Sequence, residues 1–207
     1  MITKLVEPED IERAVDQQKS RLRAAGLPES WATLGEVYAD QYVRIVRDPV
    51  RFPSGTFGTY ITIERGHASG GGVIAVPRLG ETYVLIRHWR YATGKVHLEF
   101  PRGFIDRGEQ PEQAIRRELK EEIGAGALSL TNVGVTYADT GLMNIPLQVY
   151  AVEIDNAKLV ASDEPIDGLE FLTARELAAG IANRQLDDGL TLAALALEQA
   201  WRSAGGN

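Results

Sequence analysis

One stretch of this chain, residues 111–124, restricts the possible folds more than any other, because it predicts a helix with one buried side. Pro111 suits the first helical turn, where its missing N–H would have been unpaired anyway. Gly124 suits the end of a helix. Between these ends an aliphatic residue recurs at every fourth position, at Ile115, Leu119 and Ile123. This ridge predicts that one side of the helix faces a core.

Three carboxylates, on Glu118, Glu121 and Glu122, stand beside the apolar ridge. Each residue advances about 100° around a helix, so the three occupy an arc of roughly 100°. Like charges at this spacing repel each other, and Glu122 nearly joins the buried side, where a carboxylate needs compensation. A divalent cation such as Mg²⁺ can provide it, since hard cations take oxygen ligands and often hold substrate phosphates. The alternative is a charge-rich helix face that is simply solvated.

Segments with the composition of β-strands surround this helix. They are rich in β-branched and aromatic residues and are separated by Gly, Pro and Asp. The predicted strands are residues 41–46, 58–63, 71–76, 82–89, 96–100, 130–137, 147–154 and 169–172. Further helices are predicted over residues 9–25, 174–182 and 189–202. Interleaved strands and helices indicate an α/β fold, with helices on the faces of a sheet.

The character of the chain changes near residue 58. Residues 1–58 contain a polar helix and a strand bounded by Pro and Gly, and they would be marginal as an isolated domain. We therefore predict an N-terminal extension over residues 1–58 and an α/β domain over residues 59–207.

The composition argues against several classes of protein. Cysteine is absent, which excludes disulfides, thiolate nucleophiles and cysteine-ligated metals. No run approaches the roughly 18 apolar residues of a membrane span, and the first residues lack the apolar core of a signal peptide. We therefore expect a cytoplasmic protein without a membrane partner. The formal net charge is −7 and no Lys/Arg-rich run is present, which argues against nucleic acid as a partner.

The pattern of residues over 103–125 resembles the Nudix box, the motif of a hydrolase superfamily. The matching positions are Gly103, Glu109, Arg117, Glu118, Leu119, Glu121, Glu122 and Gly124. The last aliphatic position holds Ala125, which is smaller than usual. The resemblance implies a Nudix α/β/α sandwich that hydrolyses nucleoside diphosphates linked to another moiety. It also implies Mg²⁺ as the cofactor, with Mn²⁺ as an alternative.

The resemblance carries residue roles with it. It implies that the metal is held by Glu118, Glu121 and Glu122. Arg117 would orient this cluster through ion pairs, and Glu109 would be the outer acid. Gly103 marks a turn at which the backbone carbonyl of Arg102 would also face the metal. Two metals that bridge attacking and leaving oxygens would explain the need for several carboxylates.

Residues 86–109, IRHWRYATGKVHLEFPRGFIDRGE, are similar to the ADP-ribose pyrophosphatase branch of this superfamily. The resemblance implies that Arg90 contacts a phosphate or the terminal ribose, and that Glu99 hydrogen-bonds a hydroxyl. The alternative for Arg90 is a surface ion pair at the end of a strand. A proline that this branch usually carries beyond the box is absent here, where Thr140 and Gly141 stand instead. Sugar nucleotides and other ADP-linked compounds therefore remain open.

The same branch often places a further glutamate on a loop after the last long strands, as general base or extra metal ligand. Glu164 is the candidate, with Asp163 as its neighbour, and the alternative is an ordinary polar loop. In this branch the N-terminal segment exchanges between subunits and helps to build the pocket. We therefore predict a homodimer.

The resemblance predicts a Mg²⁺-dependent pyrophosphohydrolase of ADP-ribose or a related nucleotide sugar. Its products would be a nucleoside monophosphate and a sugar phosphate. One alternative is a Nudix enzyme for dinucleoside polyphosphates or coenzyme-type diphosphates. Another is a non-catalytic module that senses a nucleotide sugar, although such modules tend to lose box carboxylates and here all are present.

Two further groups of residues have less defined roles. The histidines show no metal-ligand spacing, and we interpret them as structural residues with satisfied hydrogen bonds; they are His67, His88 and His97. Several aromatic residues in the extension could lie over a nucleobase, although we interpret most of them as core or interface residues. These are Trp31, Tyr38, Tyr42 and Phe52.

Overall fold

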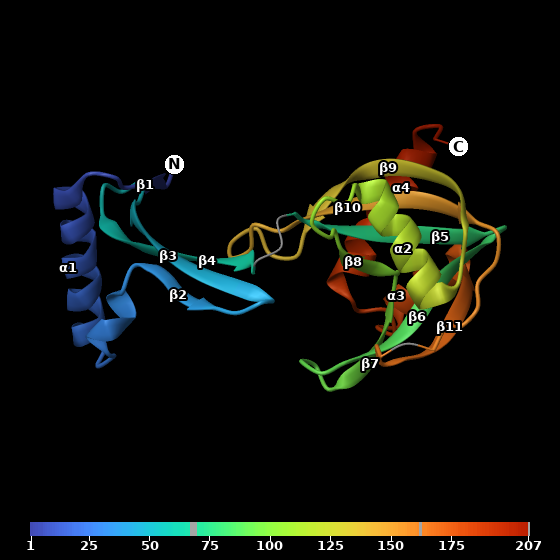
Figure 1. The fold of residues 1–207 in the computed structure, drawn as a ribbon, viewed down its shortest axis with the longest axis horizontal. Coiled ribbons are helices and arrows are strands. Elements are labelled where there is room, and N and C mark those ends of the chain that lie inside the picture. Colours follow the sequence, from blue (N-terminus) through green and yellow to red (C-terminus); the bar gives the residue numbers. More distant parts are fainter. Residues whose placement is uncertain (67–69, 162, 207) are drawn as a thin grey trace. The chain divides into compact units, whose positions relative to one another are not determined.

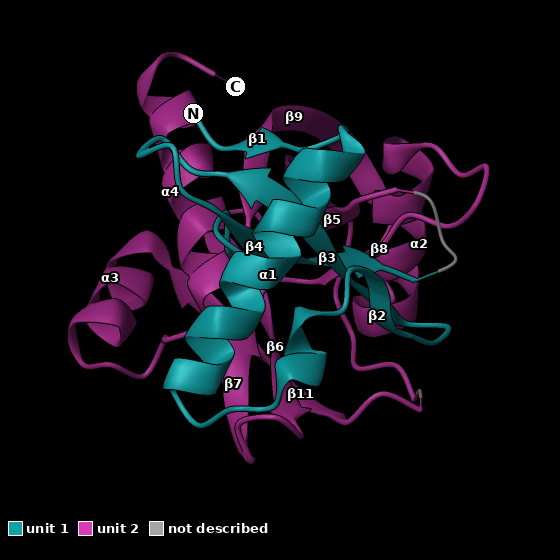
Figure 2. Ribbon diagram, turned by 90° about the vertical axis from the view of Figure 1, so that its left-hand side faces the viewer, with its two compact units in different colours: residues 1–69, 139–144 teal, residues 70–138, 145–207 magenta. Residues whose placement is uncertain are grey.

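The structure of the protein is a computed structural model that describes residues 1–66, 70–161 and 163–206. The chain forms two compact units (Figure 2). Unit 1 contains Met1–Ser69 and Asp139–Asn144, and unit 2 contains Gly70–Ala138 and Ile145–Asn207. His67 lies outside the described residues.

Unit 1 consists of a helix and a small antiparallel sheet (Figure 1). The helices are α1 (Pro8–Ala24) and a 3-10 turn at Glu29–Ala32. The strands are β1 (Thr3–Lys4), β2 (Gly35–Ala39), β3 (Val43–Arg51) and β4 (Phe57–Arg65). β3 pairs with all three other strands. The helix predicted over 9–25 and the strands predicted over 41–46 and 58–63 are confirmed, whereas β1 and β2 were not predicted.

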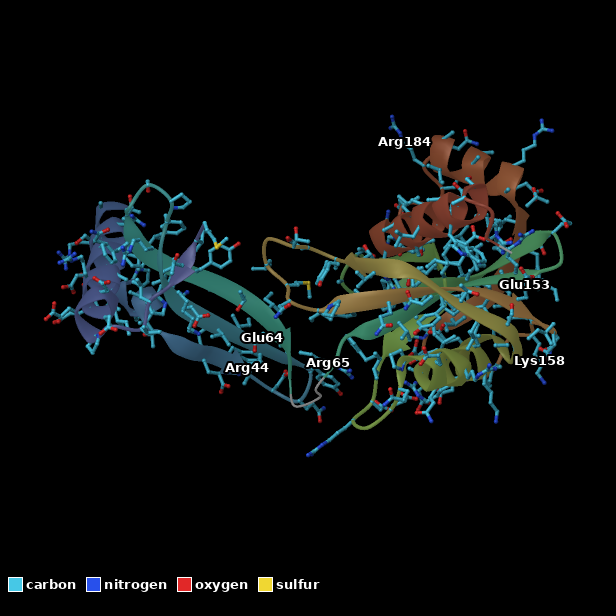
Figure 3. All side chains as sticks on the ribbon, turned by 90° about the horizontal axis from the view of Figure 1, so that it is seen from above. Arg44, Glu64, Arg65, Glu153, Lys158 and Arg184 are labelled. Atoms are coloured by element: carbon cyan, nitrogen blue, oxygen red, sulfur yellow. The ribbon has the colours of Figure 1, made fainter. Side chains whose placement is uncertain are left out.

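Charged side chains connect the strands of unit 1. Arg44 on β3 forms ion pairs with Glu36 on β2 and Glu64 on β4, and Figure 3 shows Arg44 and Glu64 side by side. The segment that contains Thr140 and Gly141 also belongs to this unit. The Tyr60 hydroxyl donates to the Gly141 carbonyl at 2.6 Å. The predicted boundary at residue 58 falls inside β4, and the division into an extension and a domain stays a prediction.

Unit 2 is built on a mixed sheet whose order is β11-β6-β5-β10-β9, with β7 beside β6 and β8 beside β5. The strands are β5 (Gly72–Leu79), β6 (Thr82–Arg90), β7 (Lys95–Glu99), β8 (Arg102–Phe104), β9 (Ala127–Tyr137), β10 (Pro146–Ile154) and β11 (Ile166–Thr173). β5 and β10 run parallel, and the other pairs are antiparallel. Each strand predicted in this region is confirmed, and only the short β8 was missed.

Helices cover both faces of this sheet, which confirms the predicted α/β/α sandwich (Figure 1). The helices are α2 (Pro111–Ile123), α3 (Ala174–Ala182) and α4 (Gly189–Ser203). One core cluster joins α2 to one face and includes Ile115, Leu119 and Ile123. A second cluster joins α3 and α4 to the other face. Arg184 follows α3 with a φ of 61°, and its side chain points away from the unit in Figure 3.

The sheet splits between β5 and β6, and the split creates the place for a site. These strands pair only at Arg78 and Leu79. Farther along, the Ala75 N–H donates to the Pro101 carbonyl at 2.9 Å, and β8 then pairs with β5. The turn between β7 and β8 therefore enters the sheet from the side and faces α2. No helix among the described residues is both long enough and apolar enough to cross a bilayer.

Candidate active site

Helix α2 forms where its sequence predicts it. Pro111 occupies the first turn, and the Gln110 N–H donates to the Gln113 side chain at 2.9 Å, which satisfies an otherwise unpaired group. Gly124 ends the helix with a φ of 58°, in the left-handed region that suits glycine. The predicted helix boundaries are confirmed.

The three acids of the helix do not share one environment. Glu118 is 6% exposed and Glu122 is 4% exposed, so both carboxylates lie within the protein. Glu121 is exposed, with 58% of its side chain accessible. The two buried acids decide against the purely solvated face considered for this helix, because solvation alone cannot keep a buried carboxylate charged.

Arg117 holds the acids together. Its guanidinium donates to both oxygens of Glu109 at 3.0 Å. It also donates to Glu118 at 2.7 Å and to Glu121 at 3.2 Å. A fifth contact, at 2.8 Å, reaches the carbonyl of Phe104 on β8. Arg117 therefore ties α2 to β8 and to Glu109, which precedes the helix, and the Glu109 hydrogen bond lowers the pKa of that carboxyl.

Gly103 makes room for one of the buried acids. A Cβ at this position would lie 1.8 Å from Oε1 of Glu118 and 2.7 Å from its Oε2. A side chain at residue 103 would have to displace the Glu118 carboxylate, so the close approach of backbone and carboxylate depends on glycine. The glycine on β8 and the acid on α2 were predicted to belong to one motif, and the structure brings them into contact.

Glu122 is a buried carboxylate with other acids nearby. The N–H of Arg102 donates to its Oε2 at 3.3 Å. Burial raises the pKa of Glu122 to about 9, and the charges of Glu118 and Glu164 add to the effect. Burial also raises the pKa of Glu118. Both groups would ionise more readily if a positive charge stood beside them.

Two arginines share a buried carboxylate on the neighbouring strands. Glu99 is 1% exposed. Arg90 donates to both of its oxygens, at 3.0 and 3.1 Å, and Arg102 donates to it at 2.7 Å. Arg102 also reaches Asp188 at 3.3 Å, and Asp188 caps α4 by accepting from the Thr191 N–H at 2.8 Å. Arg90, the last residue of β6, is therefore in a partly buried ion pair with Glu99, and its contact with a substrate stays a prediction.

A cleft of about 490 Å³ opens over these groups. Its lining includes Arg90, Arg102, Gly103, Phe104, Asp106, Arg117, Glu118, Leu147, Glu164 and Leu190. The structure thus brings Glu164, from a distant loop, to the same cleft as the helix acids. Its neighbour Asp163 is exposed and is not among the lining residues. The candidate base Glu164 thus lines the cleft, and its role as a base stays a prediction.

The donor set fits a divalent cation in kind. Carboxylate oxygens are the ligands that Mg²⁺ prefers, and Glu118 and Glu122 are buried beside the cleft with raised pKa values. Across residues 1–66, 70–161 and 163–206, no three acidic or histidine side chains already surround one point. The carboxylates would therefore have to turn to complete a coordination shell.

Several residues of the site were not predicted. Asp188 and Thr191 join α4 to the β7–β8 turn, and the Thr191 hydroxyl accepts from the Phe100 N–H at 3.1 Å. The spacing of Asp188 and Thr191 matches an N-cap, which could have identified the start of α4 but not its link to Glu99.

One histidine interpretation needs correction, and the core alternative does not apply to three of the aromatic residues. His97 is satisfied as predicted, with contacts to Thr93 at 2.7 Å and Asp187 at 2.8 Å. His88 is not, because its Nδ1 has no partner among the described residues. In unit 1 the exposed aromatic residues are Trp31, Tyr38 and Tyr42, so these three do not belong to a core.

Comparisons with known proteins agree with this geometry. The NUDIX domain model matches residues 68–190. The chain is 31% identical over 159 residues to the ADP-sugar pyrophosphatase of Mus musculus, covering 71% of this chain and 72% of that protein. It is 23% identical over 164 residues to the ADP-ribose pyrophosphatase of Bacillus subtilis (strain 168), covering 77% and 86%. The crystal structure of an ADP compounds hydrolase shares the fold, with a TM-score of 0.72, 21% identity, and coverage of 84% of this chain and 94% of that one.

Proposed function

This chain belongs to the NUDIX domain family, and from that premise we propose that it hydrolyses the pyrophosphate bond of ADP-ribose or a related nucleotide sugar. The products are a nucleoside monophosphate and a sugar phosphate. The names of the mouse and Bacillus relatives support this substrate class. Dinucleoside polyphosphates and coenzyme-type diphosphates are the alternative substrates.

The observation that carries the proposal is the pair of buried carboxylates beside an open cleft. Glu118 and Glu122 are held by Arg117, Gly103 and the N–H of Arg102. Burial of two such groups costs stability unless a cation compensates for them. Glu118, Glu121, Glu122 and the Arg102 carbonyl would hold Mg²⁺ or Mn²⁺, which when bound neutralises a diphosphate and lowers the pKa of water.

The other residues of the cleft have roles in binding and proton transfer. Glu164 accepts a proton from the attacking water, whose oxygen bonds to one phosphorus while the bridging P–O bond breaks. The electron pair of that bond leaves with the second phosphate group. Arg90 contacts a phosphate or the terminal ribose, and Glu99 hydrogen-bonds a substrate hydroxyl. The hydrogen bonds between Glu99 and Arg90 also position the guanidinium.

A non-catalytic sensing module is the rival from another class. The buried acids argue against it, since a module that only binds a sugar nucleotide has no need to retain every carboxylate of the cluster. Glu109, Glu118, Glu121 and Glu122 are all present, and Arg117 contacts three of them.

Product analysis tests the proposal. Purified protein and Mg²⁺ are incubated separately with ADP-ribose, ADP-glucose, UDP-glucose, GDP-mannose, diadenosine polyphosphates, NADH and nucleoside triphosphates. The products are separated by chromatography. We expect rapid conversion of one diphosphate to a nucleoside monophosphate. We expect Glu122→Gln to lose this activity. Glu112→Gln, an exposed acid on the same helix, is the matched control. A compound that raises the melting temperature without being cleaved would favour the sensing module.

We further propose that the protein is a cytoplasmic homodimer in which residues 1–58 exchange between subunits and complete the substrate pocket of the domain over residues 59–207. The exposed Trp31, Tyr38 and Tyr42 are suited to such a contact. Light scattering of the full chain should give twice the chain mass, and a monomeric mass would reject the homodimer.

A further inference from the structure

His88 is a buried histidine to which the proposed reaction assigns no role. It lies on β6 and is 3% exposed. Side chains alternate along a strand, so His88 and Arg90 share one face of β6. Within the described part of the chain, Nδ1 of His88 is buried and has no hydrogen-bond partner. Such an atom is uncommon in a folded protein and calls for an explanation.

The loop that carries Glu164 is fastened to β6 next to this ring. The Trp89 N–H donates to the Pro165 carbonyl at 3.0 Å, and Ile166 stands opposite His88 in the strand ladder. The Ile166 N–H donates to the Glu164 carbonyl at 2.8 Å. The backbone of Glu164 is therefore held beside His88, while its side chain extends into the cleft.

The two side chains face each other. Nε2 of His88 lies 3.9 Å from Oε2 of Glu164. This separation is about 1 Å longer than a hydrogen bond. Catalytic hydrogen bonds are often long before the substrate binds and shorten in the complex. A small rotation of the glutamate would therefore close the contact without any movement of the strand.

The surroundings of the ring determine which proton it carries. Burial and the charge of Arg90 lower the pKa of His88, which favours the neutral imidazole with one N–H. An N–H at Nδ1 would find no acceptor among the described residues, whereas an N–H at Nε2 points toward a carboxylate. The favoured tautomer carries its proton on Nε2.

We propose that His88 is a positioning residue for Glu164, and that its Nε2–H donates to the Glu164 carboxylate and holds it over the cleft. This inference rests on the proposed function, in which Glu164 accepts a proton from water. His88 touches neither substrate nor metal in this arrangement. His88 fixes the direction of the Glu164 carboxylate. The backbone of Glu164 is already held beside β6.

Two substitutions separate positioning from packing. In His88→Gln the side-chain nitrogen reaches about as far as Nε2, while in His88→Asn it reaches only about as far as Nδ1. We expect His88→Asn to lower kcat by about tenfold with KM changed by less than about twofold, the loss expected for a misplaced base. His88→Gln should restore kcat to within about threefold of the wild type.

The same two substitutions in a Glu164→Gln background complete the test. Without the carboxylate there is nothing to position, so His88→Asn should cause no further loss of kcat. Equal losses of kcat in His88→Gln and His88→Asn would mean that His88 is a packing residue and would overturn the inference. A loss of kcat in His88→Asn that persists in the Glu164→Gln background would overturn it too. Full turnover by Glu164→Gln alone would remove its premise and overturn it too.

A spectroscopic measurement tests the contact between His88 and Glu164 without depending on turnover. The chain has only three histidines, so long-range ¹⁵N–¹H spectra of the full protein can resolve each ring. We expect the Nε2–H tautomer at His88 and a shift of that nitrogen in Glu164→Gln. A proton on Nδ1, or an unchanged spectrum, would overturn the inference. This result holds whether or not the protein cleaves any compound, so it separates failure of the inference from failure of the proposed function.

Discussion

Gly103 and Glu118 approach so closely that a single added methyl group would lie 1.8 Å from the Glu118 carboxylate. The two residues come from different elements, β8 and α2, and both line the cleft. The φ angle of Gly103 does not lie in the left-handed region. Glycine is therefore needed here for space and not for the backbone conformation. The contact makes the acid's position sensitive to the smallest substitution.

The first prediction is that Gly103→Ala abolishes most of the activity while the protein still folds. The new methyl group must push Glu118 aside, and a displacement of about 1 Å in a catalytic group can cost about 100-fold in rate. Turnover of the preferred diphosphate and the far-ultraviolet spectrum provide the two readouts. Gly189→Ala is the control, since a Cβ there meets no heavy atom within 4 Å. Turnover at the wild-type rate by Gly103→Ala would contradict the interpretation that the position of Glu118 depends on the glycine.

Arg117→Lys should weaken metal binding more than it weakens folding. Lysine keeps the charge but cannot reach Glu109, Glu118 and Glu121 together, as the guanidinium does. Groups that orient metal ligands typically contribute about 10- to 100-fold in metal affinity. The Mg²⁺ concentration at half-maximal rate should therefore rise by that factor. Arg116→Lys should leave this concentration unchanged, because the described hydrogen bond of Arg116 goes to the Ala127 carbonyl and not to an acid.

The alkaline stability of unit 2 should depend on Tyr83. Its hydroxyl donates to the fully buried Glu198 of α4 at 3.0 Å, and burial together with Glu198 raises its pKa to about 12 from an ordinary 10. A raised folded pKa means that the stability is fully present below about pH 10 and is lost as the pH rises from about 10 through about 12. Urea midpoints at increasing pH should show this loss.

Tyr83→Phe serves as the comparison for that titration. It should be less stable near neutral pH by about 1 to 3 kcal/mol, because Glu198 loses a buried donor. Its stability should then decline less steeply above about pH 10, since one tyrosine with a raised pKa is gone. Parallel declines in the two proteins would show that Tyr83 titrates normally.

The elements that depend on local pattern are the ones that the sequence predicts well. The ridge of Ile115, Leu119 and Ile123, with Pro111 before it and Gly124 after it, determines α2 without help from the rest of the chain. The long strands of unit 2 are buried and apolar, so they too are predicted from short windows. Short strands such as β1 and β8 depend on their partners and cannot be identified in this way.

The acids of the candidate site, Arg117 and Gly103 were predictable because they belong to one local motif, whereas Asp188 and Thr191 were not. The acids follow from spacing within one helix, whereas Asp188 reaches Arg102 across more than eighty positions through the packing of α4. The same applies to His88, whose proximity to Glu164 depends on the register of β6 with β11 and on an irregularity in that ladder. A register shift of one residue would turn His88 to the other face. No local window contains that information.

The last prediction concerns the metal. Without a cation, Glu122 is a carboxylate that is 4% exposed and whose charge is opposed by burial and by Glu118. Glu122→Gln keeps the shape and replaces the acid by a group that cannot ionise, so in chelator it should unfold at the same temperature as the wild type or at a higher one. With Mg²⁺ the wild type should unfold at the higher temperature, because only the wild type retains the Glu122 carboxylate as a metal ligand.

The size of that reversal follows from binding linkage. A ligand at about 100 times its dissociation constant stabilises the folded state by about 2.7 kcal/mol. The wild type should therefore gain several degrees in melting temperature on addition of Mg²⁺, and Glu122→Gln should gain little. Glu112→Gln, which changes an exposed acid of the same helix, should respond to Mg²⁺ as the wild type does. An equal Mg²⁺ response in Glu122→Gln would mean that Glu122 is not a ligand, and the buried carboxylate would then need another explanation.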